Sequence, residues 1–316
     1  MNLELTKETK INNKKTNQDK SHKKLMSESK FAFLLLLPTI ILVLGLLMYP
    51  FIYSIYLSFI NLNLTKPWIG PQFVGLKNFT DILKNAEFWS SMKVTGYFTI
   101  FSVIGSLLFG LIAALILNQH FKFRGIARSI LLIPWAISGV INGLIWQWIL
   151  HPNYGVLNAA LTQLGITKDY IAWLSDPFLA VNMVILADVW KSFPFVALLL
   201  LAALQSIPSE LYEAARVDGA NALSIFRRIT LPLLTPIALV LLVLRTIDSF
   251  RIFDLIYVLT KGGPANATQV VGYYLYKEGF EFANFGYSAA GSYVITFFIL
   301  ILVFIYVKKL DQNESF

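Results

Sequence analysis

The chain has 316 residues, of which 56% are hydrophobic and 14% charged, and its formal net charge is +8. Soluble globular proteins average about 25% charged residues, so this composition excludes an ordinary soluble domain and predicts a membrane protein. Cysteine is absent, which excludes disulfides, thiol catalysis and thiolate metal sites. The basic residues flank apolar segments and do not form a basic face with aromatics, which argues against nucleic-acid binding.

Residues 1–30 are rich in Lys, Asn, Thr, Ser and Glu and contain almost nothing to bury. This composition predicts a disordered basic tail. The apolar run that follows extends from 31 to 60, beyond the length of a signal-peptide core, and we interpret it as a retained membrane helix.

Six stretches are long and apolar enough to cross the hydrocarbon core, which takes about 20 residues. They run over 31–60, 92–119, 127–150, 178–204, 233–259 and 287–307. We therefore predict an all-α membrane protein with a six-helix transmembrane domain over 31–307 and a C-terminal tail over 308–316. Outside the membrane, 153–165 and 266–282 are each predicted to form a short surface helix.

Lys and Arg residues are unequally divided between the two sides that these helices create. The tail, 120–128, 206–230 and the C-terminal end together carry 16, against 7 in the opposite loops. The positive-inside rule places the more basic side in the cytoplasm. We therefore expect both termini and the 206–230 loop to be cytoplasmic.

Small residues recur at regular spacing on two predicted helices. They are Gly139 and Gly143 on the third helix and, four apart on the second, Ser102, Ser106, Gly110 and Ala114. Such ridges let helix backbones approach closely, so we expect tight helix contacts within the chain or with a partner subunit.

The 206–230 loop has the pattern of two short helices. Ser209 follows a proline and starts the first, and Gly219 can take the positive φ that ends it. A second helix, Ala222 to Ile229, leads to Pro232, which opens the fifth membrane helix. The alternative interpretation is an ordinary amphipathic loop helix without a partner.

One spacing in this loop resembles a known family. The residues that carry the resemblance are Glu213, Ala214, Ala215, Gly219, Ile229, Leu231 and Pro232. This pattern is similar to the Glu-Ala-Ala loop of ABC importer permeases. Segments 73–79, 253–257 and 259–264 resemble the carbohydrate branch, of the maltose-importer type, and the similarity covers residues 31–307.

The resemblance implies a type I ABC importer permease fold with a cytoplasmic coupling helix, in a bacterial cytoplasmic (inner) membrane. It implies a second homologous permease, two ATP-binding subunits, an extracytoplasmic solute-binding protein and a carbohydrate cargo. The chain has no phosphate-binding Gly-x-x-x-x-Gly-Lys-Ser/Thr loop. We therefore expect no enzymatic activity and no cofactor in this chain, with ATP and Mg bound by the partner ATPase.

Six ionisable residues fall within the predicted membrane helices: Asp188, Lys191, Arg245, Asp248, Arg251 and Asp254. Such groups are costly in lipid and should face protein or water. Asp188 and Lys191 are three apart and can pair on one helix, and the other four form an alternating ladder. They are either self-neutralising structural pairs or part of a water-filled path; Arg251 and Asp254, nearest the outer end, suit a gate or loop anchor.

A sugar needs hydrogen-bonding groups beside flat aromatic surfaces. The candidates for the substrate path are Asn142, Asn182, Asp188, Trp190, Arg245, Asp248, Ser249 and Tyr293. Two alternatives stay open: the same machinery carrying glycerol phosphate or an acidic oligosaccharide, and an ion-coupled secondary transporter. The three His residues are scattered, so no metal site is expected.

Overall fold

The computed structural model describes residues 28–65 and 67–313. Contact clustering divides the chain into two units, Met1–Tyr56 and Leu57–Phe316. Helix α2 (Glu28–Val43), one π-helical turn (Leu44–Met48) and α3 (Tyr49–Ser58) follow one another without a break. Ser29–Ser58 forms one candidate span with a mean hydropathy of 2.8, which confirms the first predicted membrane helix to within two residues.

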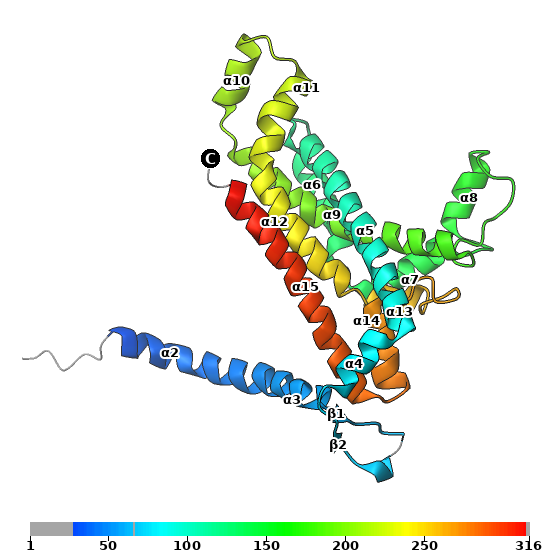
Figure 1. The fold of residues 1–316 in the computed structure, drawn as a ribbon. Helices are drawn as coiled ribbons and strands as arrows, with labels where there is room; N and C mark the ends of the chain where they lie inside the picture. The colour runs from blue at the N-terminus through cyan, green and yellow to red at the C-terminus, as the bar shows by residue number, and fades with distance from the viewer. Residues whose placement is uncertain (1–27, 66, 314–316) are drawn as a thin grey trace, which may run out of the picture. The chain divides into compact units, whose positions relative to one another are not determined.

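The second unit is built around four long helices (Figure 1). They are α5 (Ala86–Asn118), α9 (Pro177–Ser206), α12 (Leu231–Phe250) and α15 (Phe285–Asn313). The shorter helices are α4 (Lys77–Lys84), α6 (Arg124–Ala136), α7 (Gly139–Ile149), α8 (Val156–Gln163), α10 (Ser209–Val217), α11 (Ala222–Ile225), α13 (Asp254–Leu259) and α14 (Val271–Tyr276). Two-residue strands β1 (Ile60–Asn61) and β2 (Gln72–Phe73) pair antiparallel, with Ile60 opposite Phe73.

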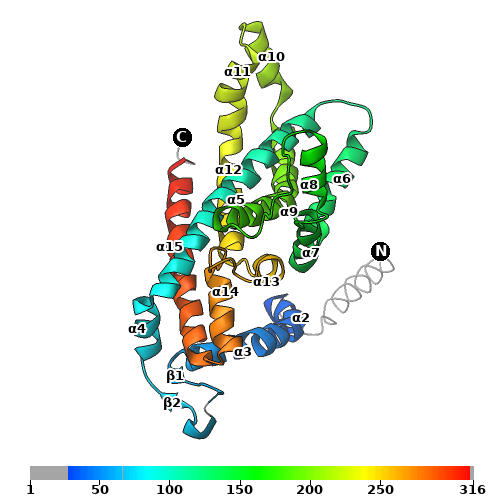
Figure 2. The same cartoon turned by 90° about the vertical axis from the view of Figure 1, so that its right-hand side faces the viewer.

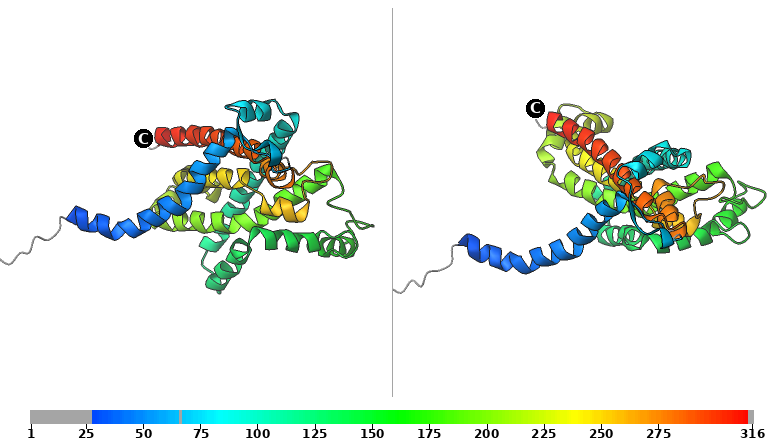
Figure 3. Two further views of the ribbon diagram at one scale, coloured as in Figure 1. Left: turned by 90° about the horizontal axis from the view of Figure 1, so that it is seen from below. Right: turned by 60° about the horizontal axis from the view of Figure 1, so that its bottom comes forward.

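Helix α12 is central in this unit because it contacts α5, α9 and α15. Helices α10 and α11 lie at one end of the long helices, and α4 with the two strands lies at the opposite end (Figures 1 and 2). Helix α15, red in Figure 3, lies at the edge of the group. Side-chain caps define the starts of two long helices: Asn85 accepts from Glu87 and Phe88 N–H at the start of α5, and Asp176 accepts from Leu179 N–H at the start of α9.

The third predicted span, 127–150, is divided in the structure into two helices. Helices α6 and α7 form a pair bent by 98°. Ile137 takes an extended conformation, and the Ser138 side chain accepts a hydrogen bond from Ile141 N–H, starting a new helix. The described residues therefore contain five candidate spans, or six if the bent pair is one span.

The fifth predicted span, 233–259, differs at both ends from the helix in the structure, which runs from Ala222 to Phe250. Helix α12 stops at Phe250, and the short α13 begins only at Asp254. At its other end α12 continues from α11 through a π-helical turn over Phe226–Thr230, so the predicted second loop helix is not separate. Pro232 lies directly after this π turn, at the start of α12, where a missing backbone N–H is tolerated.

The segment predicted as a surface helix, 266–282, is buried over much of its length and exposed at its end, where Phe280 and Phe282 lie. Helix α14 and the following π turn (Lys277–Glu281) lie against α5 and α15, and Val271 and Tyr274 are at most 1% exposed. Thr95 on α5 accepts a hydrogen bond from Val271 N–H at 2.8 Å. The other predicted surface helix is confirmed as α8.

The small-residue ridge of α5 packs against α9 within this chain. A Cβ atom at Gly110 would lie 2.5 Å from Val196 Cγ1, and one at Gly105 would lie 2.8 Å from Val189 Cγ2. On α7, Gly139 and Gly143 face Asp254 and Val258 in the same way. Glycine is therefore required where these helices cross.

We predict that Gly110→Ala destabilises the protein by about 1–3 kcal/mol, because overpacking must push Val196 or the α9 backbone aside. Gly96→Ala on the same helix is the matched control, since nothing lies within 4 Å of its Cβ position. Thermal unfolding in detergent compares the two. An equal melting temperature for both variants would contradict the packing described for α5 and α9.

Candidate functional site

A buried ion pair joins two of the long helices, α9 and α12. Arg245 Nη2 on α12 lies 2.6 Å from Asp188 Oδ2 on α9, and each residue is 6% exposed. Ser102 on α5 donates its hydroxyl proton to the same carboxylate, and Arg245 donates to Ser102 Oγ at 3.2 Å. One charge-assisted network therefore connects α5, α9 and α12.

The predicted pairing of Asp188 with Lys191 is wrong. The carboxylate turns toward α12, where a guanidinium offers several donors in a fixed fork, whereas Lys191 points its charge to the cavity described below. Of the predicted ladder, the described residues retain one ion pair, Arg245 with Asp248 at 3.9 Å. The ladder fails beyond it because α12 ends at Phe250 and Asp254 belongs to α13.

A polar cavity of about 350 Å³ opens beside the ion pair. Its walls are Gly139, Asn142, Asp188, Lys191, Ser192, Arg245, Asp248, Arg251, Ile252, Phe253, Asp254 and Leu255. The two helix breaks that the sequence did not predict lie at this cavity. Gly139 at the start of α7 and the residues between α12 and α13 form part of its wall. The volume is within the range of about 300–1,000 Å³ typical of ligand sites.

Three buried polar atoms at this place have no hydrogen-bond partner among the described residues. They are Asn142 Oδ1, Arg245 Nε and Ser249 Oγ. Asn142 Nδ2 is used, since it donates to Ala187 O at 3.2 Å. A buried group left without a partner costs about 1–3 kcal/mol, so this set favours a ligand or water with hydroxyl groups.

The structure brings together half of the predicted substrate-path residues. Asn142, Asp188, Arg245 and Asp248 line the cavity, and Ser249 is buried on the adjoining turn of α12.

The other three predicted residues lie elsewhere. Asn182 accepts a hydrogen bond from the Tyr97 hydroxyl at 3.2 Å, and Trp190 packs edge to face with Trp146. Tyr293 lies on α15 and is not among the residues that line the cavity.

The sequence did not predict Ser192 at the cavity, and it suggested Ser102 only as a packing residue. It left Lys191, Arg251 and Asp254 as structural pairs, a gate or part of a water-filled path, and not among the candidate substrate contacts. The charge of Lys191, Arg251 and Asp254 was a usable signal, because ionisable groups at membrane depth face protein or water. For Ser102 the sequence offered none, because a hydroxyl on a small-residue ridge is common. Residues 28–65 and 67–313 contain no group of three or more His, Asp or Glu placed to hold a metal.

The 206–230 loop forms a second candidate site. Helix α10 has no buried residue, and Gly219 has φ +77° at its end, as predicted. Glu213 and Ala214 are exposed, and so are the apolar Leu211 (44%) and Val217 (88%). This helix therefore presents an uncovered surface at one end of the molecule.

Short contacts connect this surface to α12. The hydroxyls of Tyr212 on α10 and Thr230 lie 3.3 Å apart, and Thr230 is buried. The Asn221 side chain accepts from Ser224 N–H and starts the continuous helix that runs from Ala222 to Phe250. Ile229 and the two residues Leu231 and Pro232 lie on that helix.

We predict that Asp188→Ala destabilises the protein by about 3–5 kcal/mol, because it leaves the Arg245 guanidinium buried without a counter-charge. The double variant Asp188→Asn with Arg245→Gln removes both charges and should be more stable than Asp188→Ala. Asp248→Asn is the control, since that side chain is 63% exposed and its pair is worth at most about 1 kcal/mol. Thermal unfolding in detergent measures all three; a smaller loss for Asp188→Ala than for the control would contradict the pair's importance.

The chain is similar to a known protein family and to several named relatives. Residues 106–312 match the family described as binding-protein-dependent transport system inner membrane component. The chain is 42% identical to the trehalose/maltose transport system permease protein MalF of Thermococcus litoralis, over 89% of this chain and 94% of that protein. It is 37% identical to the sulfoquinovosyl glycerol transport system permease SmoG of Agrobacterium fabrum, over 92% and 93%.

A solved structure shares the fold. A bacterial ABC transporter that imports the acidic polysaccharide alginate contains a chain with a TM-score of 0.77 and 28% identity, covering 89% of this chain and 95% of that one. The architecture is thus that of a type I ABC importer permease. Members of this family are transport permeases, not enzymes. The chain belongs to the binding-protein-dependent transport system inner membrane components.

Proposed function

We propose that this chain is one of two different permease subunits of an ATP-driven, binding-protein-dependent importer of oligosaccharides. The polar cavity carries the proposal, because its amide, hydroxyl, carboxylate and cationic side chains can form hydrogen bonds with a cargo rich in hydroxyls. Two of its lining residues, Asn142 and Arg245, each have a buried polar atom without a partner among the described residues. The relatives support it, since their names describe transport of trehalose or maltose and of a sulfoquinovosyl glycerol.

The charges of the cavity favour an uncharged saccharide. Arg245 is already neutralised by Asp188 at 2.6 Å, and Asp248 lies 3.9 Å from the same guanidinium. Lys191 and Arg251 are matched in number by Asp248 and Asp254 on the same walls. An acidic oligosaccharide or glycerol phosphate would have to compete with these carboxylates.

The exposed helix α10 is the proposed contact with the ATPase. Glu213 is available to a basic residue, the small Ala214 and Ala215 let a groove close over the helix, and Gly219 sets its end. Ile229, Leu231 and Pro232 would join it to α12. A displacement of α10 would be transmitted to the continuous helix that runs from Ala222 to Phe250. Along this helix Ile225 and Arg245 are about 30 Å apart, at 1.5 Å per residue. Alternating access would follow if the ATPase binds the two states of this contact differently.

The surrounding assembly follows from the same reasoning. A second permease, two ATP-binding subunits that hold ATP and Mg, and an extracytoplasmic solute-binding protein would complete the importer. The excess of Lys and Arg on one side supports a cytoplasmic position for both termini and for α10. The related alginate transporter has been solved with its periplasmic protein bound to an alginate pentasaccharide.

Uptake by cells that lack the chain tests the proposed cargo. Re-expression should restore uptake of a labelled neutral oligosaccharide such as maltose or trehalose, and not of glycerol phosphate or an acidic oligosaccharide. Restoration of only an acidic cargo, lost selectively in Arg245→Gln, would replace the neutral cargo with the acidic one. Failure to restore any saccharide would contradict the proposal.

We predict that Gly219→Val abolishes uptake and ATPase co-purification while membrane insertion stays normal, because valine cannot take φ +77° without strain. Ala214→Asp should do the same without backbone strain, by putting a charge at the contact.

Gly165→Val is the matched control for the glycine variant. Gly165 has φ +70° and, like Gly219, nothing within 4 Å of its Cβ position, but it lies outside the loop. It should keep the ATPase and transport. Normal uptake by Gly219→Val or Ala214→Asp, or equal loss in Gly165→Val, would remove the basis for α10 as the coupling contact.

A further inference from the structure

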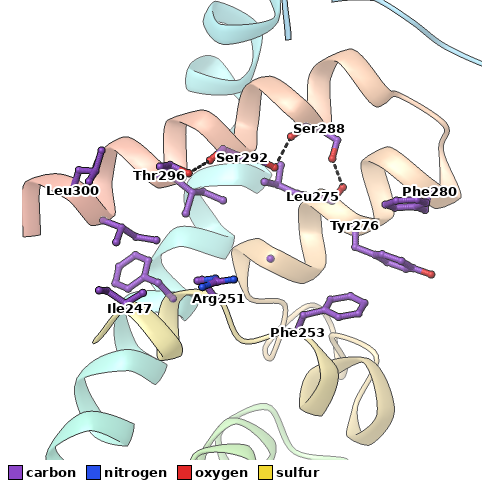
Figure 4. Close-up of a pocket in the computed structure, with 14 residues that line it drawn as sticks. Ile247, Arg251, Phe253, Leu275, Tyr276, Phe280, Ser288, Ser292, Thr296 and Leu300 are labelled. Atoms are coloured by element: carbon purple, nitrogen blue, oxygen red, sulfur yellow. Dashed lines mark hydrogen bonds between the residues drawn. The ribbon is translucent and has the colours of Figure 1, made fainter. Parts of the chain in front are cut away.

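A second cavity lies between α12, α14 and α15, and the polar cavity does not account for it. Its volume is about 680 Å³. Arg251 and Phe253, in the break after α12, line both cavities, so the two adjoin at this break. Figure 4 shows Arg251 and Phe253 below the cavity, with α15 above it.

Three aromatic residues, Phe253, Tyr276 and Phe280, line one side of this cavity, and the rings of Tyr257 and Tyr273 pack against them without lining it. We name Phe253, Tyr257, Tyr273, Tyr276 and Phe280 the aromatic ladder. Ring centroids of Phe253 and Tyr276 are 4.8 Å apart, those of Tyr276 and Phe280 are 5.2 Å apart, and those of Tyr273 and Tyr276 are 6.3 Å apart. The ladder runs from a buried ring, Tyr273 at 5% exposure, to an open one, Phe280 at 68%.

Hydroxyl groups form the opposite side. Ser288, Ser292 and Thr296 are spaced four apart on α15 and share one face. Each donates its proton to a backbone carbonyl: Ser288 to Leu275 at 2.8 Å, Ser292 to Ser288 at 3.0 Å and Thr296 to Ser292 at 2.8 Å. Each oxygen atom can therefore still accept a hydrogen bond, from a ligand with donors or from water.

This combination suits a saccharide, which can use both the aromatic and the hydroxyl side of the cavity. An acyl chain would fill an apolar groove but has no proton to donate to three acceptors. A pyranose presents C–H groups to an aromatic face and hydroxyl protons around its edge. Phe280 and Tyr276 are stacked at 24°, so their roughly parallel rings offer a flat face.

We propose that this cavity is an entry subsite at which one sugar ring of the cargo stacks on the aromatic ladder and donates hydrogen bonds to Ser288, Ser292 and Thr296 before it passes Arg251 into the polar cavity. The inference rests on the proposed transport of oligosaccharides. The inference adds a second binding site for the sugar, which the cargo would contact before it enters the polar cavity.

The test is saccharide uptake by the assembled transporter in cells, with three substitutions at equal membrane level. Phe280→Leu keeps an apolar side chain and removes the ring face, and should raise the transport KM about three- to tenfold. Phe280→Trp keeps a ring and should stay within about twofold of the wild type. Phe297→Leu, at an exposed ring on α15 that does not line the cavity, should behave as the wild type.

The outcomes separate the two proposals. Saccharide uptake with an unchanged KM for Phe280→Leu overturns the subsite alone. An equal defect in Phe280→Leu and Phe280→Trp also overturns it, since that pattern means packing against lipid or protein. No saccharide uptake by the wild type overturns the proposed function and the subsite together. If Phe280→Leu inserts poorly, Ser292→Ala replaces it: a raised KM supports the subsite, and an unchanged one overturns it.

Discussion

The ion pair of Arg245 with Asp188 is the constraint on which the membrane part of this protein depends. Two charges at membrane depth are tolerated only because they neutralise each other and share Ser102. Their three helices, α5, α9 and α12, must therefore keep a fixed register at this point. The glycine ridge of α5 lets α9 come close enough for the network to form. The pair also holds the wall of the polar cavity in place.

The two ends of α12 lead from this ion pair to different parts of the molecule. Toward α11 the helix continues through a π turn to the exposed loop, where α10 leaves apolar side chains uncovered. Toward the other end it stops at Phe250, and the break from Arg251 to Phe253 separates the polar cavity from the aromatic one. One helix thus connects the proposed ATPase contact, the charge network and the proposed sugar path. That arrangement suits a transporter in which ATP hydrolysis moves α10 and α12 and so changes access to the polar cavity.

The membrane class, most helix positions, the end of α10 at Gly219 and the family were predictable, because hydropathy, positive φ at glycine and a spaced motif are local signals. The partner of Asp188 was not, since Arg245 is 57 residues away and spacing along one helix favoured Lys191. The 98° bend after Ala136 was missed because the apolar composition continues through it. The stop at Phe250 was missed because the charges of Asp248, Arg251 and Asp254 were interpreted as a ladder on one continuous helix. The break between α12 and α13 places Arg251 and Asp254 at the cavity. Because the end of α12 was predicted incorrectly, these two residues were not predicted as contacts for the substrate.

The central claim is that transport through this chain is driven by ATP hydrolysis on a partner and delivered through α10. The most direct measurement is uptake of a labelled neutral oligosaccharide into proteoliposomes that contain the complex purified through this chain, with its solute-binding protein. The account predicts uptake that requires hydrolysable ATP on the side of α10 and persists when a protonophore abolishes ion gradients. Uptake that continues without ATP and collapses with the protonophore would contradict it and indicate an ion-coupled transporter.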